Sequence, residues 1–318
     1  MKKAINTEHI EGRIYQHSLV VKKVQNETSS NFGKDFISGE LDVATDEEGL
    51  NVITVHFTYV TEYTKNNAKN QTYATLLRII NEGKTWIADG RDAATMVKVD
   101  TSLGLNDFYT QDDTLVSARR NEGGFVTIVN SLADPSERNT FNMDMIITAV
   151  NTIDADEDKG ITEPYVTLRG AVFNFRNDIL PVEFFVRNPA GMKYFSNLDI
   201  DNSHPIFTKV WGKIVSTTSY IEKAEESAFG EAAVKTYERK TKEWVVTGTA
   251  KIPYDFGDEK VLTVDELTTA MQNRNVYLAE VQQKNKEYRA NRMAPGGSAT
   301  SKSPLSSFPE AKKGTFNF

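Results

Sequence analysis

Residues 10–17 read IEGRIYQH, residues 31–43 read NFGKDFISGELDV and residues 51–60 read NVITVHFTYV. Much of each run alternates between apolar and polar residues, which is the pattern of a β-strand with one buried face. Gly12 and Gly39 lie inside the first two runs, where a glycine marks a bulge or a tight bend. The stretch therefore predicts three strands of a small, strongly bent β-sheet.

The rest of the N-terminal half continues with a helix and more strands. Residues 71–81 carry apolar side chains at helical spacing, and Gly83 suits the end of that helix. Further strands are expected near residues 94–100, 113–119 and 124–131, with Gly123 and Gly124 as a hairpin turn. This order is that of the five-stranded barrel called the OB fold, which we expect over residues 1–135.

Residues 136–260 predict a second module with the same order of elements. Three strands are expected near residues 143–149, 166–172 and 182–186, followed by a short helix that begins at Pro189. Two more strands are expected over residues 207–216 and 243–251. The chain should therefore be mainly β with added helices, built as two OB-like five-stranded barrels.

The C-terminal part is expected to form a long helix over residues 261–293 and a flexible tail over residues 294–318. Thr263 and Glu266 form a capping box that starts the helix, which would either pack across the barrels or bind a partner. The tail is rich in Pro, Gly and Ser and ends in Phe316 and Phe318. These two aromatic residues have no core to join, so they are either incidental or a hook for a partner protein.

The composition and motifs exclude several classes of protein. The chain has no cysteine, which rules out a disulfide scaffold, a thiolate zinc site and a cysteine nucleophile. No apolar run approaches the roughly 20 residues that span a bilayer, and the first residues lack the apolar part of a signal peptide. Phosphate-binding and dinucleotide-binding glycine motifs are absent. We therefore expect a cytoplasmic protein that is not an enzyme and holds no cofactor or metal.

The net charge of −7 at first argues against a nucleic-acid partner. However, the acidic residues gather in short runs, at 46–48 and 154–158, where turns are expected. Residues 264–318 carry eight Lys and Arg against five Asp and Glu. The distribution of charge therefore leaves room for basic surfaces.

The outward faces of the predicted strands carry the candidate nucleic-acid contacts. In the first module, alternation turns Ile14, Val55 and Phe57 inward, so the residues between them face outward. Aromatic side chains on such a face stack on bases, and Lys and Arg follow the phosphates. The first-module candidates are Arg13, Tyr15, His17, Phe32, Lys34, Phe36 and His56.

The second module offers a similar combination of cations and aromatic rings. Lys209, Trp211 and Lys213 share one face of a strand, which could form a stacking platform with a phosphate clamp. Arg169 and Phe173 are the other second-module candidates. The alternative for all these aromatic residues is that they fill a barrel or pack beneath a neighbouring element.

Three parts of the chain together resemble the single-stranded-DNA-binding proteins of tailed bacteriophages. They are residues 10–60, chiefly Gly12 to Tyr15 and Asn31 to Gly39, then residues 210–214, and the tail. The resemblance implies an OB-fold protein that coats exposed strands during DNA replication or recombination, in the host cytoplasm, with a C-terminal hook for replication proteins. In many such proteins the tail is strongly acidic before its last aromatic residue, whereas here Lys312 and Lys313 precede it.

The leading prediction is therefore a non-catalytic protein that binds single-stranded DNA with little sequence preference. One alternative is a viral structural or assembly protein whose β-domains bind other proteins. Another is a metal-dependent nuclease whose active site forms only in space. The sequence leaves open the oligomeric state and the choice between DNA and RNA.

Overall fold

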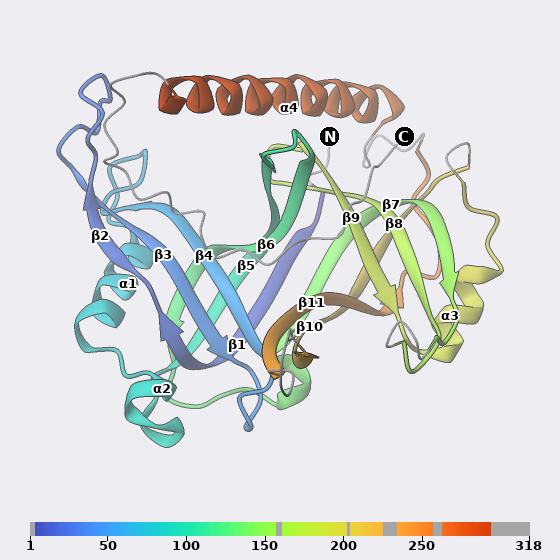
Figure 1. Ribbon diagram of the computed structural model, residues 1–318, viewed down its shortest axis with the longest axis horizontal. Helices are drawn as coiled ribbons and strands as arrows, with labels where there is room; N and C mark the ends of the chain where they lie inside the picture. The colour runs from blue at the N-terminus through green and yellow to red at the C-terminus, as the bar shows by residue number, and fades with distance from the viewer. Residues whose placement is uncertain (1–3, 157–160, 202–203, 225–233, 257–262, 294–318) are drawn as a thin grey trace, which may run out of the picture.

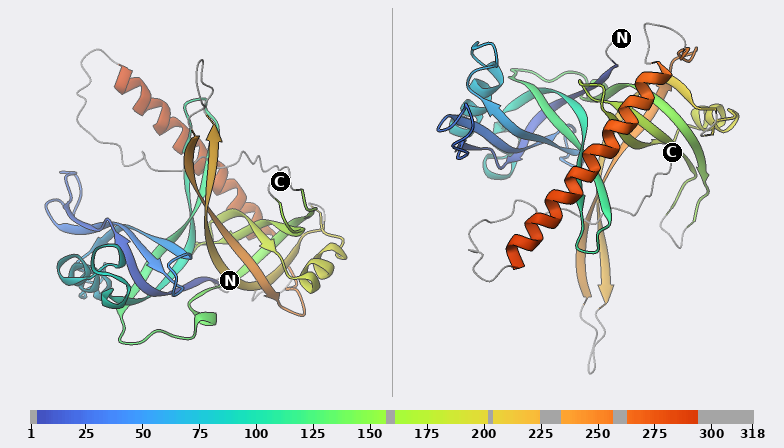
Figure 2. Two further views of the ribbon diagram at one scale, coloured as in Figure 1. Left: turned by 60° about the horizontal axis from the view of Figure 1, so that its bottom comes forward. Right: turned by 90° about the horizontal axis from the view of Figure 1, so that it is seen from above.

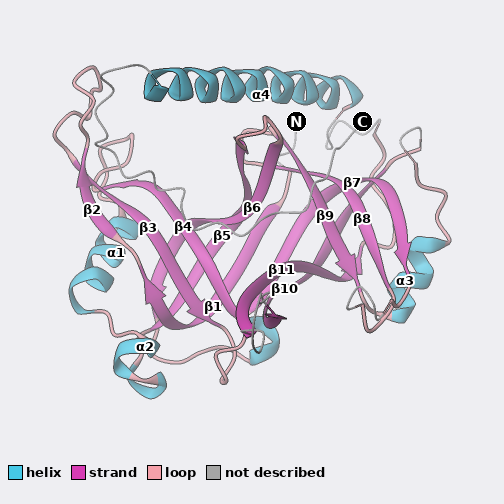
Figure 3. Ribbon diagram, in the orientation of Figure 1, coloured by secondary structure: helices cyan, strands magenta, loops and turns pink. Residues whose placement is uncertain are grey.

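The computed structural model describes residues 4–156, 161–201, 204–224, 234–256 and 263–293. Its described strands form one hydrogen-bonded sheet of eleven strands, accompanied by a few short helices and one long C-terminal helix (Figure 3). The prediction of a mainly β fold with added helices is confirmed. The predicted tail, with Phe316 and Phe318, lies outside the described residues.

Five strands of the N-terminal half pair in a closed circuit. β1 pairs with β5, β5 with β6, β6 with β4, β4 with β3, and β3 again with β1. Only the β4–β6 pairing is parallel. We call this circuit the first ring, and β2 extends it as an edge strand on β3. Its elements are β1 (Asn6–His17), β2 (Val20–Lys23), β3 (Asp35–Ala44), β4 (Val52–Thr61), α1 (Gln71–Glu82), α2 (Trp86–Asp89), η1 (Arg91–Ala93), β5 (Met96–Tyr109) and β6 (Leu115–Ile128).

Five strands of the C-terminal half close in the same way. β7 pairs with β8, β8 with β9, β9 with β11, β11 with β10, and β10 with β7, and only β9–β11 is parallel. We call this circuit the second ring. After η2 (Pro135–Glu137), its elements are β7 (Asn139–Ile153), β8 (Tyr165–Phe173), β9 (Ile179–Val186), α3 (Pro189–Ser196), β10 (Ile206–Ala224) and β11 (Val234–Thr249).

The alternating apolar residues point into the rings, as the sequence pattern predicts. Ile14, Leu41 and Val55 are fully buried in one large hydrophobic cluster. Two glycines let the strands of the first ring bend. A Cβ atom on Gly12 would lie 2.0 Å from the carbonyl oxygen of Ala44, so only glycine allows β1 and β3 to approach so closely. Gly39 has a φ of 137° beside a register shift between β3 and β4, which confirms the expected bulge.

The two rings join along β1 and at one buried carboxylate. Residues 6–10 of β1 pair with β7, so the sheet continues from one ring into the other. The carboxylate of Glu8 accepts hydrogen bonds from the indole nitrogen of Trp244 at 2.8 Å and from the hydroxyl of Thr101 at 2.7 Å. Burial raises the pKa of Glu8 to about 7, although these two hydrogen bonds act in the opposite direction. Glu8 therefore links β1 to a strand of each ring.

Two long hairpins project side by side from between the rings (Figure 2). One is β5–β6 and the other is β10–β11, whose strands extend well beyond the short strands predicted at 207–216 and 243–251. The hairpin turn predicted at Gly123 and Gly124 is wrong, because β6 continues through both residues and the turn lies at residues 110–114. A Cβ atom on Gly123 would lie 2.2 Å from the ring of Phe57, so close packing requires this glycine.

The long helix α4 (Val264–Met293) crosses one side of the molecule over both rings (Figure 1). The predicted capping box is confirmed: the Glu266 amide donates to the Thr263 hydroxyl at 3.2 Å, and the Thr263 amide donates to the Glu266 carboxylate at 2.9 Å. Leu267, Ala270 and Met271 pack on a second, smaller hydrophobic cluster on the outer side of the second ring. The first turns of α4 therefore pack on the second ring, and packing of this kind was one of the two roles expected for the helix.

Candidate nucleic-acid interface

An aromatic and basic surface lies on the outer side of the first ring, across β2, β3 and β4. Lys22 pairs with Phe36 across β2 and β3, so the two side chains share one face. The rings of Phe36 and Tyr59 lie 4.7 Å apart between centroids, at an angle of 42°. Tyr59 is 47% exposed. We call Lys22, Phe36 and Tyr59 the first-ring platform.

The turn between β2 and β3 extends this platform. Phe32, at 53% exposure, and the exposed Lys34 lie in that turn. The Lys34 ammonium donates to the side-chain oxygen of Asn31 at 3.0 Å. Three of the predicted contacts, Phe32, Lys34 and Phe36, therefore fall on one end of the first ring beside β2.

Two of the predicted contacts on β1, Arg13 and Tyr15, lie at a different end of the ring, whereas His17 pairs with Leu41 in the middle of β3. Arg13 pairs with Ala44, at the far end of β3 from Phe36, which is roughly 25 Å along the strand. The ring of Tyr15 faces Trp86 of α2 at 6.0 Å, and the Arg13 guanidinium donates to the Ala94 carbonyl at 3.5 Å. The sequence predicted one continuous face, but the structure divides these residues between the α2 side and the platform.

The two predicted histidines are poor cations at neutral pH. Burial lowers the pKa of His17 and, together with Lys242 and Arg120, lowers that of His56 to about 4. Nδ1 of His56 lies 3.2 Å from a carboxylate oxygen of Glu40. His56 is therefore neutral near pH 7 and does not supply a positive charge to a phosphate.

The assignment of Phe173 to the interface is wrong. Its side chain points away from the second-ring interior, as the strand phase requires, but it is fully buried in the small cluster beneath α4. Its ring lies 6.1 Å from that of Phe207, edge to face. Alternation gave the correct face of the strand, whereas the helix that covers this face could not be seen from a strand pattern.

The other second-module candidates remain at the surface, with varied surroundings. Arg169 forms an ion pair with Glu183 at 3.1 Å. Lys213 donates to the carbonyl of Ser136 and to Asn139 at 3.3 Å, and burial lowers its pKa. Trp211 is 41% exposed, and Lys209 is half-buried on the same outward phase of β10. The structure therefore holds Lys213 against η2 and leaves the Trp211 indole partly open.

Tyr59 and Lys22 are platform residues that the sequence reasoning missed. Strict alternation from Phe57 would turn Tyr59 inward. Ile37 pairs with Val60, and Gly39 pairs with Phe57. One residue of β3 therefore lies opposite two residues of β4, which is a β-bulge in β4. The extra residue rotates Tyr59 to the outside. Gly39, which lies at this register shift, was the feature of the sequence that indicated a bulge here.

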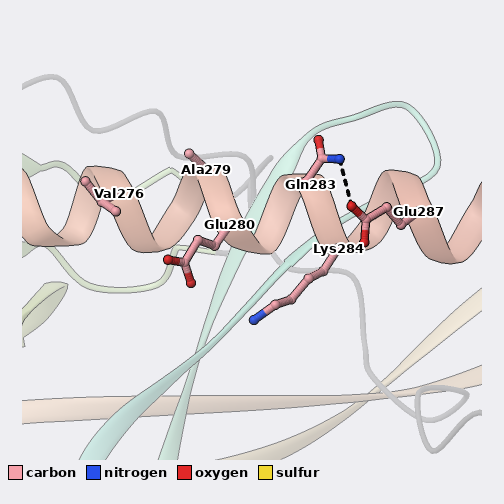
Figure 4. Close-up of a pocket in the computed structure, with 6 residues that line it drawn as sticks. All are labelled: Val276, Ala279, Glu280, Gln283, Lys284 and Glu287. Atoms are coloured by element: carbon pink, nitrogen blue, oxygen red, sulfur yellow. Dashed lines mark hydrogen bonds between the residues drawn. The ribbon is translucent and has the colours of Figure 1, made fainter.

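Two hollows lie beside α4, and neither contains a residue predicted to bind nucleic acid. The first, of about 480 Å³, is lined among the described residues by Val276, Ala279, Glu280, Gln283, Lys284 and Glu287 (Figure 4). The second, of about 320 Å³, lies between the β5–β6 hairpin, the β8–β9 turn and α4. Its charged groups pair with each other, as in Arg274 with Asp107 and Arg120 with Glu122. No grouping of three or more potential metal ligands occurs within the described residues.

Helices that could span a membrane are absent from the described part of the chain.

A comparison with solved structures finds a deletion mutant of the single-stranded DNA binding protein from Thermus aquaticus. The likeness is distant, with a TM-score of 0.46 and 12% identity, over 81% of this chain and 100% of that chain. No curated protein matches the sequence. The family model described as YorF matches residues 7–284, which is most of the chain. The chain therefore belongs to the YorF family.

Proposed function

We propose that this protein binds and protects single-stranded DNA during DNA replication or recombination, without catalysing a reaction. The observation that carries the proposal is the first-ring platform with the adjoining Phe32 and Lys34. These aromatic and basic side chains, of which only Phe36 is half-buried and the others are exposed, lie on the second and third strands of a closed five-stranded circuit and on the connection before them. In an OB barrel, those strands and that connection bind oligonucleotides.

The order of elements supports treating both rings as OB-like barrels. In each ring, a helix follows the third strand, and the third and fifth strands pair in parallel to close the circuit. On this proposal, residues 1–135 and 136–260 are the two barrel domains, residues 261–293 are a helix that spans them, and residues 294–318 are a tail.

The chemistry of the platform suits a single strand better than a duplex. Aromatic rings such as Phe36 and Tyr59 can stack only on bases whose faces are exposed, and each stack contributes about 1–3 kcal/mol. Lys22 lies on the same face as Phe36 and can follow a phosphate. The negative net charge of the whole chain does not oppose this, because binding depends on the local field.

The remaining parts of the proposal concern cellular context. We infer a protein encoded by a tailed bacteriophage and active in the host cytoplasm, with Phe316 and Phe318 as the hook for a replication protein.

The proposal is tested by removing the platform rings. Phe36→Ala with Tyr59→Ala should weaken binding of a labelled oligonucleotide of about 30 nucleotides by roughly 2–6 kcal/mol, measured by fluorescence anisotropy. A matched control is Phe125→Ala with Tyr194→Ala, which removes a 73% exposed and a 40% exposed ring elsewhere. If both pairs lose affinity equally, or the wild-type protein does not bind at low salt, the proposal is wrong.

A further inference from the structure

Three side chains of the second ring form a cation–aromatic stack on the outer face of β8 and β9. The rings of Tyr165 and Phe185 lie 5.7 Å apart between centroids, at an angle of 48°. The guanidinium carbon of Arg187 lies 4.9 Å from the centroid of Tyr165 and 5.9 Å from that of Phe185. The Arg187 side chain is 40% exposed, so the guanidinium forms the outer layer of this stack.

Glu243 of β11 holds the guanidinium through two nitrogen atoms. Nη2 of Arg187 donates to both carboxylate oxygens, at 2.8 and 2.7 Å, and Nε donates to one of them at 3.1 Å. This fork geometry fits the oxygens of a phosphate as well as those of a carboxylate. The Glu243 side chain is 23% exposed, so solvent reaches the pair.

The surroundings of this pair add further positive charge. Arg119 of β6 reaches across from the first ring, lies 5.1 Å over the Trp244 ring and donates to the carbonyl of Glu183. Arg169 shares the outer face, because it pairs with Glu183 across β8 and β9. Burial lowers the pKa of Arg119, whereas the neighbouring Glu183 and Glu243 act to raise it. Arg169 thus lies at the same surface as the stack, and Arg119 lies beneath it, near the Glu183 and Glu243 carboxylates.

We propose that the stack of Tyr165, Phe185 and Arg187 is a second binding site for single-stranded nucleic acid, and that Glu243 is its built-in competitor. One base stacks on the guanidinium, and the adjoining phosphate takes the place of the Glu243 carboxylate. The inference rests on the proposed function and deepens it. The position of the stack supports a binding site, because β8 and β9 are the second and third strands of their ring, as β3 and β4 are in the first.

If Glu243 competes with phosphate for Arg187, the variants should behave differently from those of a basic patch without a competing carboxylate. Removing the charge of Glu243 releases the fork of Arg187, so the Glu243→Gln variant should bind a single strand more tightly than the wild type. Arg187→Ala removes the outer layer and the phosphate contact, so it should bind about tenfold more weakly. In the double variant the gain from Glu243→Gln should vanish, because Glu243 acts through Arg187.

The experiment measures these affinities for the full chain with labelled single-stranded DNA, and with RNA of the same sequence, at about 50 mM salt. Arg78 and Glu82 provide the matched control, since they form an exposed ion pair on α1 at 3.4 Å. Arg187→Lys serves as a second variant that keeps the charge, and it should also weaken binding because lysine lacks the fork.

The outcomes separate this inference from the proposed function. Tighter binding by Glu243→Gln, no gain with Glu82→Gln, and loss of the gain in the double variant would support the site. Equal gains for Glu243→Gln and Glu82→Gln would overturn it, because general charge would then explain the effect. If Arg187→Ala and Arg187→Lys bind normally while the platform variant is weakened, the second site is wrong and the proposed function stands.

Discussion

Glu8 is the residue whose carboxylate joins the two rings through side-chain hydrogen bonds. One oxygen accepts from Trp244 of the second ring and the other from Thr101 of the first. Glu8 is 2% exposed, and Glu122 nearby adds to the effect of burial on its pKa. A carboxylate with a raised pKa favours the folded state when it is protonated, and this contribution is lost as the pH rises through about 7.

Glu8→Gln should therefore change the pH dependence of stability. The amide can still accept from Trp244 and can donate to Thr101, but it cannot ionise. Relative to the wild type, the variant should gain on the order of 3 kcal/mol in free energy of unfolding between about pH 4 and about pH 8. Urea unfolding at several pH values measures this difference, and the variant-minus-wild-type comparison cancels other titrating groups such as His56. A constant difference across that range would show that Glu8 does not titrate near neutral pH.

The helix α4 is held in two different ways along its length. Its first turns pack apolar residues on the second ring, and beyond them polar contacts tie it to the β5–β6 hairpin. Arg274 pairs with Asp107 at 2.8 Å, with side chains that are 10% and 2% exposed. Arg289 near the other end donates to Asp113 at 3.1 Å and to carbonyls of the hairpin turn, in a more exposed setting.

The burial of these two arginines predicts different costs of removing them. Arg274→Ala leaves the buried Asp107 without its cation and should lower the free energy of unfolding by about 3–5 kcal/mol. Arg289→Ala breaks an exposed contact and should cost about 1 kcal/mol. Urea unfolding measures both, and amide hydrogen exchange over residues 264–293 shows whether the helix is released. Equal losses in free energy of unfolding for the two variants would contradict the prediction that the buried pair contributes more than the exposed one.

Across the molecule, the alternating pattern predicted the strands correctly wherever one face of a strand is buried. Ile14, Leu41 and Val55 lie where the pattern put them, and the mainly β fold follows from such runs. The pattern failed where a second element covers a strand, as α4 covers Phe173, and where a bulge changes the phase, as at Tyr59. These events depend on contacts between residues far apart in sequence, which a local period does not record.

The long hairpins were missed for a related reason. The sequence of residues 217–224 and 234–242 lacks the apolar alternation of a half-buried strand, yet these parts of β10 and β11 pair with each other. Backbone pairing in such a ribbon needs no buried face, so it leaves little trace in hydrophobic periodicity. The separation of Arg13 and Tyr15 from the platform also follows from strand register, which the sequence alone did not fix.

The preference of this protein for single strands over duplex can be measured by competition. Labelled single-stranded DNA of about 30 nucleotides is bound to the wild-type protein, and unlabelled single-stranded or duplex DNA of the same sequence is added as competitor across a salt series. We expect the single strand to compete far better than the duplex at every salt concentration, and affinity to fall as salt rises because phosphate contacts release counterions. Equal competition by the duplex, or no binding of either form at low salt, would contradict it.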